Sequence, residues 1–380
     1  MSVRMLEPEA RVLAVGLGNI GSHLVSHIGR MPEVAEVTLI DHDVYEDGNL
    51  LSQSITPSEV RRPKALVQAT RLRRINPALR VLPIIDSVER LPLGQLRADV
   101  ILACVDSRRT RLAISQAAWR VGAPLVDAGV DGAGLLARVN VYLPGGDGPC
   151  LECAYDERDY AAIETVYPCT VSSATNGGDK SGSAFSTVAP STIGALAAAL
   201  QAIECRKLLT RQLEQAAIGR QILIDARHHR HYLTTIPRNP NCRFDHEVWP
   251  ISPIRNRPNA ITLGEAFTLG GAGDPTRRGI GIAVEGSVFV RQLTCRSCGW
   301  KRSVQRLDRS LRATERVCKS CRQETMFAAG FDLAERLEAS TLPRRAMARS
   351  LASFGLRNGD VFSLVGPGGR SHFEIEGDRL

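Results

Sequence analysis

The sequence predicts an α/β protein: a Rossmann-like domain with a mostly parallel sheet, followed by a small zinc-ribbon domain. Near the start, "RVLAVGLGNIGSHLVSHIG" has the pattern of a short strand, a glycine turn and a helix. Further apolar runs, "EVTLID" and "DVILACVD", have the length and composition of buried strands. Toward the end, two Cys-x-x-Cys pairs are separated by 19 residues, a spacing typical of a zinc ribbon.

The first turn carries Gly16, Gly18 and Gly21. Glycines there allow a tight turn and a close approach of the backbone to phosphate, and the helix N-terminus favours anions. The next strand ends in Asp41, 20 residues after Gly21, which suits a carboxylate that reaches a ribose hydroxyl. These features predict a nucleotide site. On their own they fit a nicotinamide-dependent dehydrogenase as well as any other enzyme that uses a nucleotide.

Polar residues farther along narrow this choice. The segment "DHDVYEDGNLLSQS" contains Asp43 and Asn49, and "RRPKA" contains Lys64. The strand "DVILACVD" leads into Asp106, at the carboxyl end where open α/β sheets place their ligands. Any one of these residues would suit ordinary turn chemistry, since Asp and Asn favour turns, but their combined spacing does not.

Over roughly residues 10–245, these motifs resemble the adenylating enzymes of the ThiF/MoeB superfamily, which includes the activating enzymes of ubiquitin and its relatives. The resemblance implies a Rossmann-like adenylation domain over residues 1–247. It implies contacts with ATP and Mg²⁺ at Gly16, Gly18, Gly21, Asp41, Asp43, Asn49, Lys64 and Asp106.

The same resemblance implies individual roles. Asp41 would hold the ribose, with Asp43 in the same acidic strand end, and Asn49 and Lys64 would contact the phosphates, where charge spreads during adenylyl transfer. Asp106 would hold Mg²⁺ and so orient the α-phosphate, which makes Lys64 and Asp106 catalytic candidates. Arg111 matches a family arginine that braces the site rather than reacting.

The chain departs from the family at Ser52. The family commonly has Asn-Leu-x-Arg, with the arginine on the phosphates, whereas this chain has Asn49-Leu50-Leu51-Ser52. A hydroxyl replaces neither the charge nor the fork of donors of a guanidinium. Arg4 or Arg11 is a candidate to supply the missing cation.

One group of cysteines predicts a first zinc site. Cys150 and Cys153 form a Cys-x-x-Cys half site, and structural zinc needs four ligands. The family often completes such a site after an "RNP-x-C" run, and here "RNPNCRFDH" supplies Cys242 and His246. Asp245 is the alternative fourth ligand, and a site without metal, with Cys242 as a core thiol, is a further alternative.

The second group predicts the zinc ribbon at residues 295–321. Its expected ligands are Cys295, Cys298, Cys318 and Cys321. We expect a small module or docking surface there, with no catalytic role. Cys104 and Cys205 lie in apolar segments and are expected to be core thiols.

Cys169 lies outside both groups, in "VYPCTVSSATNGGDKSGS", within a predicted crossover loop at 150–187. The run from Cys150 to the Cys169-Thr170 pair resembles the segment that joins a zinc knuckle to the catalytic cysteine in activating enzymes of ubiquitin-like proteins. Sulfur-carrier adenylating enzymes often place a cysteine nearer the next helix, where this chain has Gly182. The resemblance therefore favours Cys169 as a thioester-forming nucleophile over a bystander thiol.

Composition sets the remaining expectations. Residues 248–275 are proline-rich and are predicted to be a linker, and residues 276–380 a small C-terminal domain. Residues 291–350 hold 14 Lys and Arg against 6 Asp and Glu, an excess equal to the +8 of the whole chain. We favour a solvated basic face there, then a protein partner, then nucleic acid. Without a long apolar run or a secretion signal, no membrane contact and a cytoplasmic location are expected.

The motifs and the resemblance together predict that the protein activates the C-terminus of a ubiquitin-like protein by adenylation. Thioester formation on Cys169 and transfer to a conjugating-enzyme-like protein would follow. The resemblance also implies a homodimer. Two alternatives of similar fold are an adenylyltransferase for a sulfur-carrier protein, without an obligatory thioester, and a non-catalytic scaffold, which Ser52 suggests.

Overall fold

The computed structural model describes residues 9–164, 189–269, 279–366 and 369–376. The chain divides into two units, which are treated separately. The first consists of Met1–Glu89 and Ala98–Val248, and the second of Arg90–Arg97 and Trp249–Leu380. None of the helices in the described part of the chain has the length and apolarity that a membrane crossing requires.

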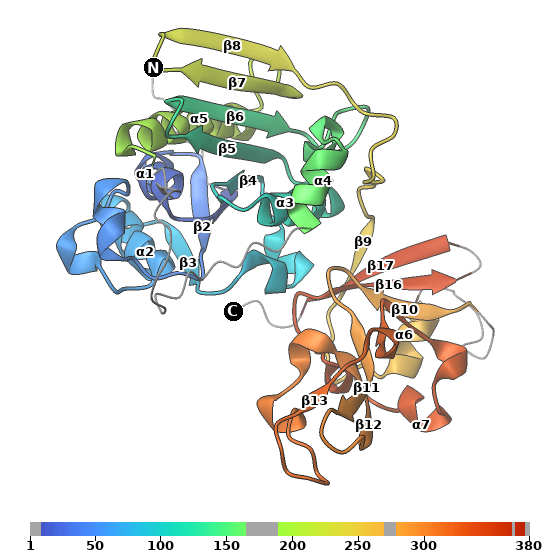
Figure 1. Cartoon of the computed structure of the whole chain (residues 1–380). Coiled ribbons are helices and arrows are strands. Elements are labelled where there is room, and N and C mark those ends of the chain that lie inside the picture. Colours follow the sequence, from blue (N-terminus) through green and yellow to red (C-terminus); the bar gives the residue numbers. More distant parts are fainter. Residues whose placement is uncertain (1–8, 165–188, 270–278, 367–368, 377–380) are drawn as a thin grey trace. The chain divides into compact units, whose positions relative to one another are not determined.

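An eight-stranded sheet in the order β3-β2-β1-β4-β5-β6-β7-β8 organises the first unit (Figure 1). The strands are β1 (Ala10–Val15), β2 (Val34–Ile40), β3 (Arg80–Ile84), β4 (Val100–Ala103), β5 (Leu125–Asp131), β6 (Leu136–Tyr142), β7 (Arg220–Asp225) and β8 (Arg230–Thr235). The pairs from β3 to β5 are parallel, whereas β5 to β8 pair antiparallel. The predicted α/β fold with a mostly parallel sheet is confirmed.

Helices cover both faces of the central strands. They are α1 (Asn19–Ile28), α2 (Lys64–Ile75), α3 (Arg108–Val121), α4 (Glu157–Glu164) and α5 (Ser191–Leu209). The helices α1, α2 and α5 share one apolar core with the strands, which includes Leu24, Leu72 and Ala198. The helix α3 connects β4 to β5, in the opposite direction across the sheet from α1 and α2, so a right-handed crossover places it on the other face.

The strand order reverses between β1 and β4, and this position fixes the candidate site. Register pairs Val15 with both Ile40 and Ala103, so the carboxyl ends of β1, β2 and β4 are level. The loops that leave β1 and β4 diverge there and open a crevice, as open α/β sheets do at such switch points. Gly16 follows β1 with φ +85°, and a Cβ atom on it would lie 2.8 Å from the carbonyl oxygen of Cys104.

The second unit contains two smaller sheets. One has the order β15-β10-β16-β17-β9 and the other β12-β11-β13, with β14 also paired to β11. The strands are β9 (Ile251–Ile254), β10 (Gly281–Val284), β11 (Phe289–Cys295), β12 (Lys301–Leu307), β13 (Met326–Phe327), β14 (Leu333–Ala334), β15 (Arg336–Glu338), β16 (Val361–Gly366) and β17 (Gly369–Ile375). The helices α6 (Leu263–Leu269) and α7 (Arg344–Met347) pack with the larger sheet.

The second unit also shows where the sequence pattern gave an incomplete picture. Within residues 248–275, β9 pairs with β17, and α6 buries Phe267 in the core, which the prolines did not indicate. The segment Arg90–Arg97 belongs with this unit, because the N–H of Gly94 donates to the carbonyl of Gly359 at 2.8 Å. The predicted domain boundaries stay a prediction.

Candidate functional site

A cavity of ≈ 1050 Å³ lies at the carboxyl ends of the central strands of the first unit. Its walls come from the glycine turn after β1, the loops after β2 and β4, the start of α3, the outer strands and α4. The lining residues used below are Gly16, Gly18, Asp41, Asp43, Gln53, Lys64, Asp106, Arg108, Arg111, Arg138, Asn140, Tyr142, Asp159, Gln221 and Thr234. Six of the eight predicted nucleotide contacts therefore line this cavity, and the exceptions are Gly21 and Asn49.

Asp41 ties the glycine turn to the loop after β2. Its two carboxylate oxygens accept hydrogen bonds from the backbone N–H of Leu17, at 2.7 Å, and of Asp43, at 2.8 Å. Burial raises the pKa of Asp41 above its ordinary value, while these donors and Lys64 oppose the rise. Each oxygen keeps acceptor capacity, so the carboxylate can both order the loop and accept from a ribose hydroxyl.

Tyr45 also links the loop after β2 to the glycine turn after β1. Its hydroxyl donates to the carbonyl of Leu17 at 2.8 Å and accepts from the side-chain amide of Gln68 at 2.7 Å. Burial raises the pKa of Tyr45 above its ordinary value, so the hydroxyl stays protonated. The loops after β1 and β2 are therefore held by two independent side chains.

Lys64 is the first residue of α2 and is almost fully buried, at 8% exposed. Its Nζ lies 2.9 Å from a carboxylate oxygen of Asp43, which is half exposed. Lys64 and Asp43 also line a second, smaller hollow of ≈ 230 Å³ together with Asn49. Among the described residues, Asn49 lines this hollow and not the larger cavity, and its side-chain oxygen accepts from the N–H of Glu46 at 2.9 Å. Its predicted contact with phosphates stays a prediction.

Ser52, at the position of the missing arginine, is buried at the end of a 3₁₀ turn. The next residue, Gln53, lines the cavity, and its Oε1 is buried without a hydrogen-bond partner in the described part of the chain. An amide can accept or donate at a ligand but brings no charge. The sequence analysis did not predict a role for Gln53, although it directly follows Ser52, where the family commonly has arginine.

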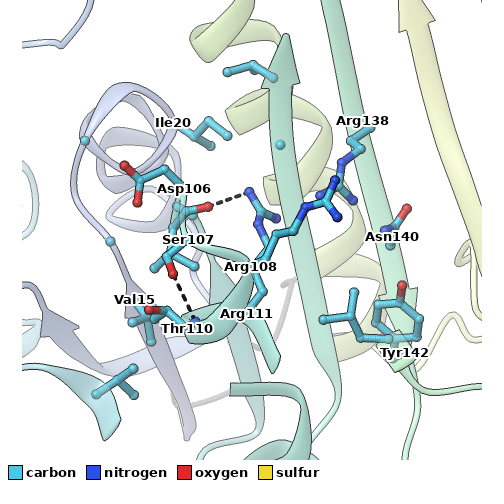
Figure 2. Close-up of a pocket in the computed structure, with 18 of the residues that line it drawn as sticks. Val15, Ile20, Asp106, Ser107, Arg108, Thr110, Arg111, Arg138, Asn140 and Tyr142 are labelled. Atoms are coloured by element: carbon cyan, nitrogen blue, oxygen red, sulfur yellow. Dashed lines mark hydrogen bonds between the residues drawn. The ribbon is translucent and has the colours of Figure 1, made fainter. Parts of the chain in front are cut away.

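Asp106 lies three residues past the end of β4, is exposed and lines the cavity. Ser107 caps α3 by accepting from the N–H of Thr110 at 3.3 Å, which fixes the turn that presents Asp106. Figure 2 shows Asp106 near Ile20 on one side of the cavity. An exposed carboxylate suits a hard cation such as Mg²⁺.

Arg111 is buried and braces this wall. Its guanidinium pairs with Asp127, which is fully buried, and donates to the carbonyls of Val105 and Ala128. The second oxygen of Asp127 accepts from Arg138 at 3.1 Å. Three of the five N–H donors of Arg111 bond to protein groups, which is compatible with the expected bracing role.

The strand β6 supplies a wall that sequence analysis missed. Arg138, Asn140 and Tyr142 alternate along it and face the cavity, opposite Asp106 in Figure 2. Asn140 pairs in register with Gln221 of β7, which pairs with Thr234 of β8, so a polar row crosses the sheet. The Oδ1 of Asn140 is buried without a partner in the described part of the chain. The signal was the polar alternation in "ARVNVY", within an apolar strand.

The helix α4 closes another side. Arg108 reaches across to Asp159 on α4, with 2.6 Å between Nη1 and Oδ1. Glu152 lies between the two cysteines of the first knuckle and is buried. It accepts from Gln116 on α3 at 2.9 Å and from the hydroxyl of Tyr160 on α4 at 3.0 Å. The knuckle, α3 and α4 therefore form one connected unit beside the cavity.

The first predicted zinc site is assembled by Cys150, Cys153, Cys242 and His246, whose ligand atoms lie within 4.8 Å of one another. The sulfur of Cys150 lies 3.9 Å from that of Cys153 and 3.7 Å from that of Cys242. Tetrahedral zinc with bonds of about 2.3 Å places two sulfurs about 3.8 Å apart, so the site fits the ion. A third edge joins the sulfur of Cys153 to Nε2 of His246, at 3.1 Å.

Asp245, the alternative fourth ligand, is turned to another partner. Arg120 holds both of its carboxylate oxygens, at 2.6 and 2.9 Å, and stacks on Phe244. This pairing holds the pKa of Asp245 below its usual range, despite partial burial. His246, and not Asp245, therefore lies with the three cysteines in the cluster that could hold a metal ion.

The ribbon ligands Cys295, Cys298, Cys318 and Cys321 also form one cluster. Cys295 lies 3.6 Å from Cys321, and Cys298 lies 3.6 Å from Cys318, which again matches the edges of tetrahedral zinc. A zinc ion bound there would therefore connect β11 and the two knuckles of the smaller sheet.

The remaining cysteines separate by burial. Cys104 and Cys205 are buried core thiols, as predicted, and burial raises the pKa of each to about 12. Cys104 donates to the side-chain oxygen of Gln201 at 3.1 Å. Cys169 lies outside the described residues, as does Arg4.

The chain is similar in sequence to known proteins of one family. A model described as ThiF family matches residues 8–244. The sulfur carrier protein ThiS adenylyltransferase of Escherichia coli (strain K12) is 29% identical over 152 residues, 39% of this chain and 59% of that protein. A sulfur carrier protein adenylyltransferase of Thermus thermophilus is 30% identical over 244 residues, 61% of this chain and 81% of that protein. Ubiquitin-like modifier-activating enzyme 5 of Gallus gallus is 26% identical over 157 residues, 38% of this chain and 39% of that protein.

The match to curated relatives is partial in length. The chain spans 36% and 59% of the lengths of the first two relatives that it matches. The family model ends at residue 244, so the second unit lies almost entirely outside it.

Proposed function

Because the chain belongs to the ThiF family, we propose that it uses ATP to adenylate the C-terminal carboxylate of a ubiquitin-like or sulfur-carrier protein. The names of two relatives refer to a sulfur carrier and that of a third to a ubiquitin-like modifier, which supports this substrate class. The single observation that carries the proposal is the cavity. It joins the glycine turn to the polar wall of β6 in one space of ≈ 1050 Å³, room for both a nucleotide and the end of a peptide chain.

The reaction follows from charge placement. A carboxylate oxygen of the substrate attacks the α-phosphorus of ATP, the bond from that phosphorus to the bridging oxygen breaks, and pyrophosphate leaves. The product is an acyl-adenylate, a mixed anhydride with an electrophilic carbonyl. Lys64 lines the cavity and offsets negative charge on the phosphates, while Asp41 orders the ribose.

Two kinds of metal fit the residues present. Asp106 would hold Mg²⁺, which supplies charge neutralisation at the phosphates when bound. The two clusters with Cys295 and with His246 would hold structural zinc. Arg111 and Asp127 keep the wall behind Asp106 in place.

The second step of the proposal is a thioester on Cys169. The thiolate attacks the carbonyl of the acyl-adenylate, the bond to AMP breaks, and the acyl group moves to sulfur before transfer to a conjugating protein. Support comes from the resemblance of the sequence from Cys150 to Cys169 and from the similarity to modifier-activating enzyme 5. We further propose that the chain acts as a homodimer, as the resemblance implies.

A sulfur-carrier adenylyltransferase is the second candidate. It is favoured by the two relatives named as sulfur-carrier adenylyltransferases, one of them matched over 81% of its length. In this case the adenylate accepts sulfur directly, and Cys169 is dispensable for pyrophosphate release. A scaffold without catalysis is the third candidate, because Ser52 lacks the expected charge.

The test combines pyrophosphate release with a non-reducing gel, using ATP, Mg²⁺ and ubiquitin-like or sulfur-carrier proteins from the same genome. The variants are Cys169→Ala and Asp106→Ala, with Asp147→Ala, an exposed residue outside the cavity, as the control. A reductant-sensitive adduct that is lost in the first two and kept in the control supports the thioester route. Pyrophosphate release without an adduct, unchanged by Cys169→Ala, selects the sulfur-carrier route. No release with any substrate selects the scaffold.

A further inference from the structure

One ion pair joins two walls of the cavity while staying largely exposed. Arg108 opens α3, two residues after Asp106, and its Nη1 lies 2.6 Å from Oδ1 of Asp159 on α4. The side chains are 56% and 30% exposed, and both line the cavity. Exposed pairs of this kind contribute about 0–1 kcal/mol, so an incoming anion can replace one partner at low cost.

The other cations of the cavity are already committed. Among the described lining residues the Lys and Arg side chains are Lys64, Arg108, Arg111 and Arg138. Arg111 is buried and pairs with Asp127 and two carbonyls, and Arg138 shares the same buried Asp127. Lys64 is buried and pairs with Asp43. Arg108 is therefore the cation with both the exposure and the freedom to change partner.

A triphosphate needs more positive charge than Lys64 offers. The lining residues also include the carboxylates of Asp41, Asp43, Asp86, Glu89, Asp106 and Asp159, which repel an anion. Gln53, which also lines the cavity, brings no charge, and neither does Ser52 beside it. A guanidinium can bind phosphate through two parallel hydrogen bonds, which are stronger than bonds between neutral groups.

We propose that Arg108 is the second cation of the triphosphate site, and that it exchanges Asp159 for the phosphate chain when ATP binds. This inference rests on the proposed function, because it presumes an ATP site in this cavity. It has a structural consequence: in the ATP-bound state α4 loses its ion pair to α3. The hydrogen bond between Tyr160 and Glu152 then remains as a link from α4 to the zinc knuckle.

The exchange predicts effects of opposite sign for the two partners. Arg108→Ala weakens binding of a non-hydrolysable ATP analogue by about tenfold or more, the range of a lost charged hydrogen bond. Asp159→Asn frees Arg108 and tightens the analogue by about two- to fivefold, the worth of an exposed pair. Asn keeps an oxygen for the N–H of Asp156, which the Oδ2 of Asp159 now accepts at 3.1 Å. Binding of AMP changes in neither variant, because AMP lacks the β- and γ-phosphates.

Titration calorimetry on the full chain with Mg²⁺ measures these affinities. Arg109→Ala is the matched control, because Arg109 is the exposed neighbour that does not line the cavity. The double variant Arg108→Ala, Asp159→Asn is expected to match Arg108→Ala alone.

The outcomes separate cleanly. Weaker binding of both nucleotides in both single variants would mean a purely structural ion pair, and the inference would fall. Normal ATP binding by Arg108→Ala, with a wild type that binds ATP, would overturn this inference and leave the proposed function standing. A wild type that binds neither nucleotide would overturn both.

Discussion

The guanidinium of Arg120 grips both carboxylate oxygens of Asp245, one residue before His246 completes the first metal cluster. On the proposal that each cluster binds one zinc ion, we expect His246→Ala to lose the ion of the first cluster in an EDTA challenge, while Asp245→Asn keeps both ions. Zinc content after the challenge, measured by mass spectrometry, checks this. Equal zinc loss in the two variants would show that Asp245 also binds the ion.

Asp127 pairs with both Arg111 and Arg138 from a position with no exposure to solvent. We expect Asp127→Ala to destabilise the chain by about 3–5 kcal/mol, because it leaves the buried Arg111 without its counter-charge. Urea unfolding monitored by circular dichroism measures this, with Asp147→Ala as the exposed control. A loss no larger than the control's would mean that water or another group compensates Arg111.

Gly16 has φ +85°, and a Cβ atom there would meet the carbonyl of Cys104 at 2.8 Å. We expect Gly16→Ala to cost about 1–3 kcal/mol of stability and to abolish nucleotide binding, since the turn must shift to relieve the clash. Gly48→Ala is the control, because nothing lies within 4 Å of its added Cβ. Calorimetric melting and ATP titration test both parts, and unchanged ATP binding by Gly16→Ala would contradict the assignment of this turn.

His23 on α1 contacts the hydroxyl of Ser191 on α5 at 2.9 Å. Burial lowers the pKa of His23 below the ordinary histidine value of 6.5, and the neighbouring His27 and Arg71 add to this. The unfolded chain therefore binds the proton more tightly, so stability is complete above pH 6.5 and falls as the pH drops through the interval below it.

We expect His23→Gln to flatten this decline in urea midpoints between about pH 7.5 and 5.5. His231→Gln, at an exposed position on β8, is the control. Any loss of zinc at low pH would affect both variants alike. Parallel slopes in the two variants would mean that His23 does not carry the pH dependence.

The parts of the site that sequence predicted best are those defined by local spacing. Gly16 is set by a turn that other residues enter only with strain, and Cys295 and Cys298 by the short reach of a zinc knuckle. Burial of Cys104 followed from the apolar strand around it. Each of these depends on a few neighbouring residues, and a single chain suffices to recognise them.

The parts that were missed depend on pairing between distant segments. Arg138 and Asn140 face the cavity because β6 pairs with β5 in one register, and a shift of one residue would turn them to the other face. Arg108 acquires its partner only when α4 packs beside α3. No local pattern in the sequence encodes these relationships.

The excursion of Arg90–Arg97 has a consequence for any attempt to divide this protein. The chain leaves the first unit at Arg90, contributes Leu93 and Leu96 as buried residues to the second unit, and returns after Arg97. Truncation of the chain after residue 248 would therefore remove the rest of the unit to which these two leucines belong. It would also remove the Arg97–Glu374 ion pair. The C-terminal unit therefore includes a segment from inside the N-terminal part of the sequence, and no single cut separates the two units. Any attempt to produce one unit alone should first redesign the segment Arg90–Arg97.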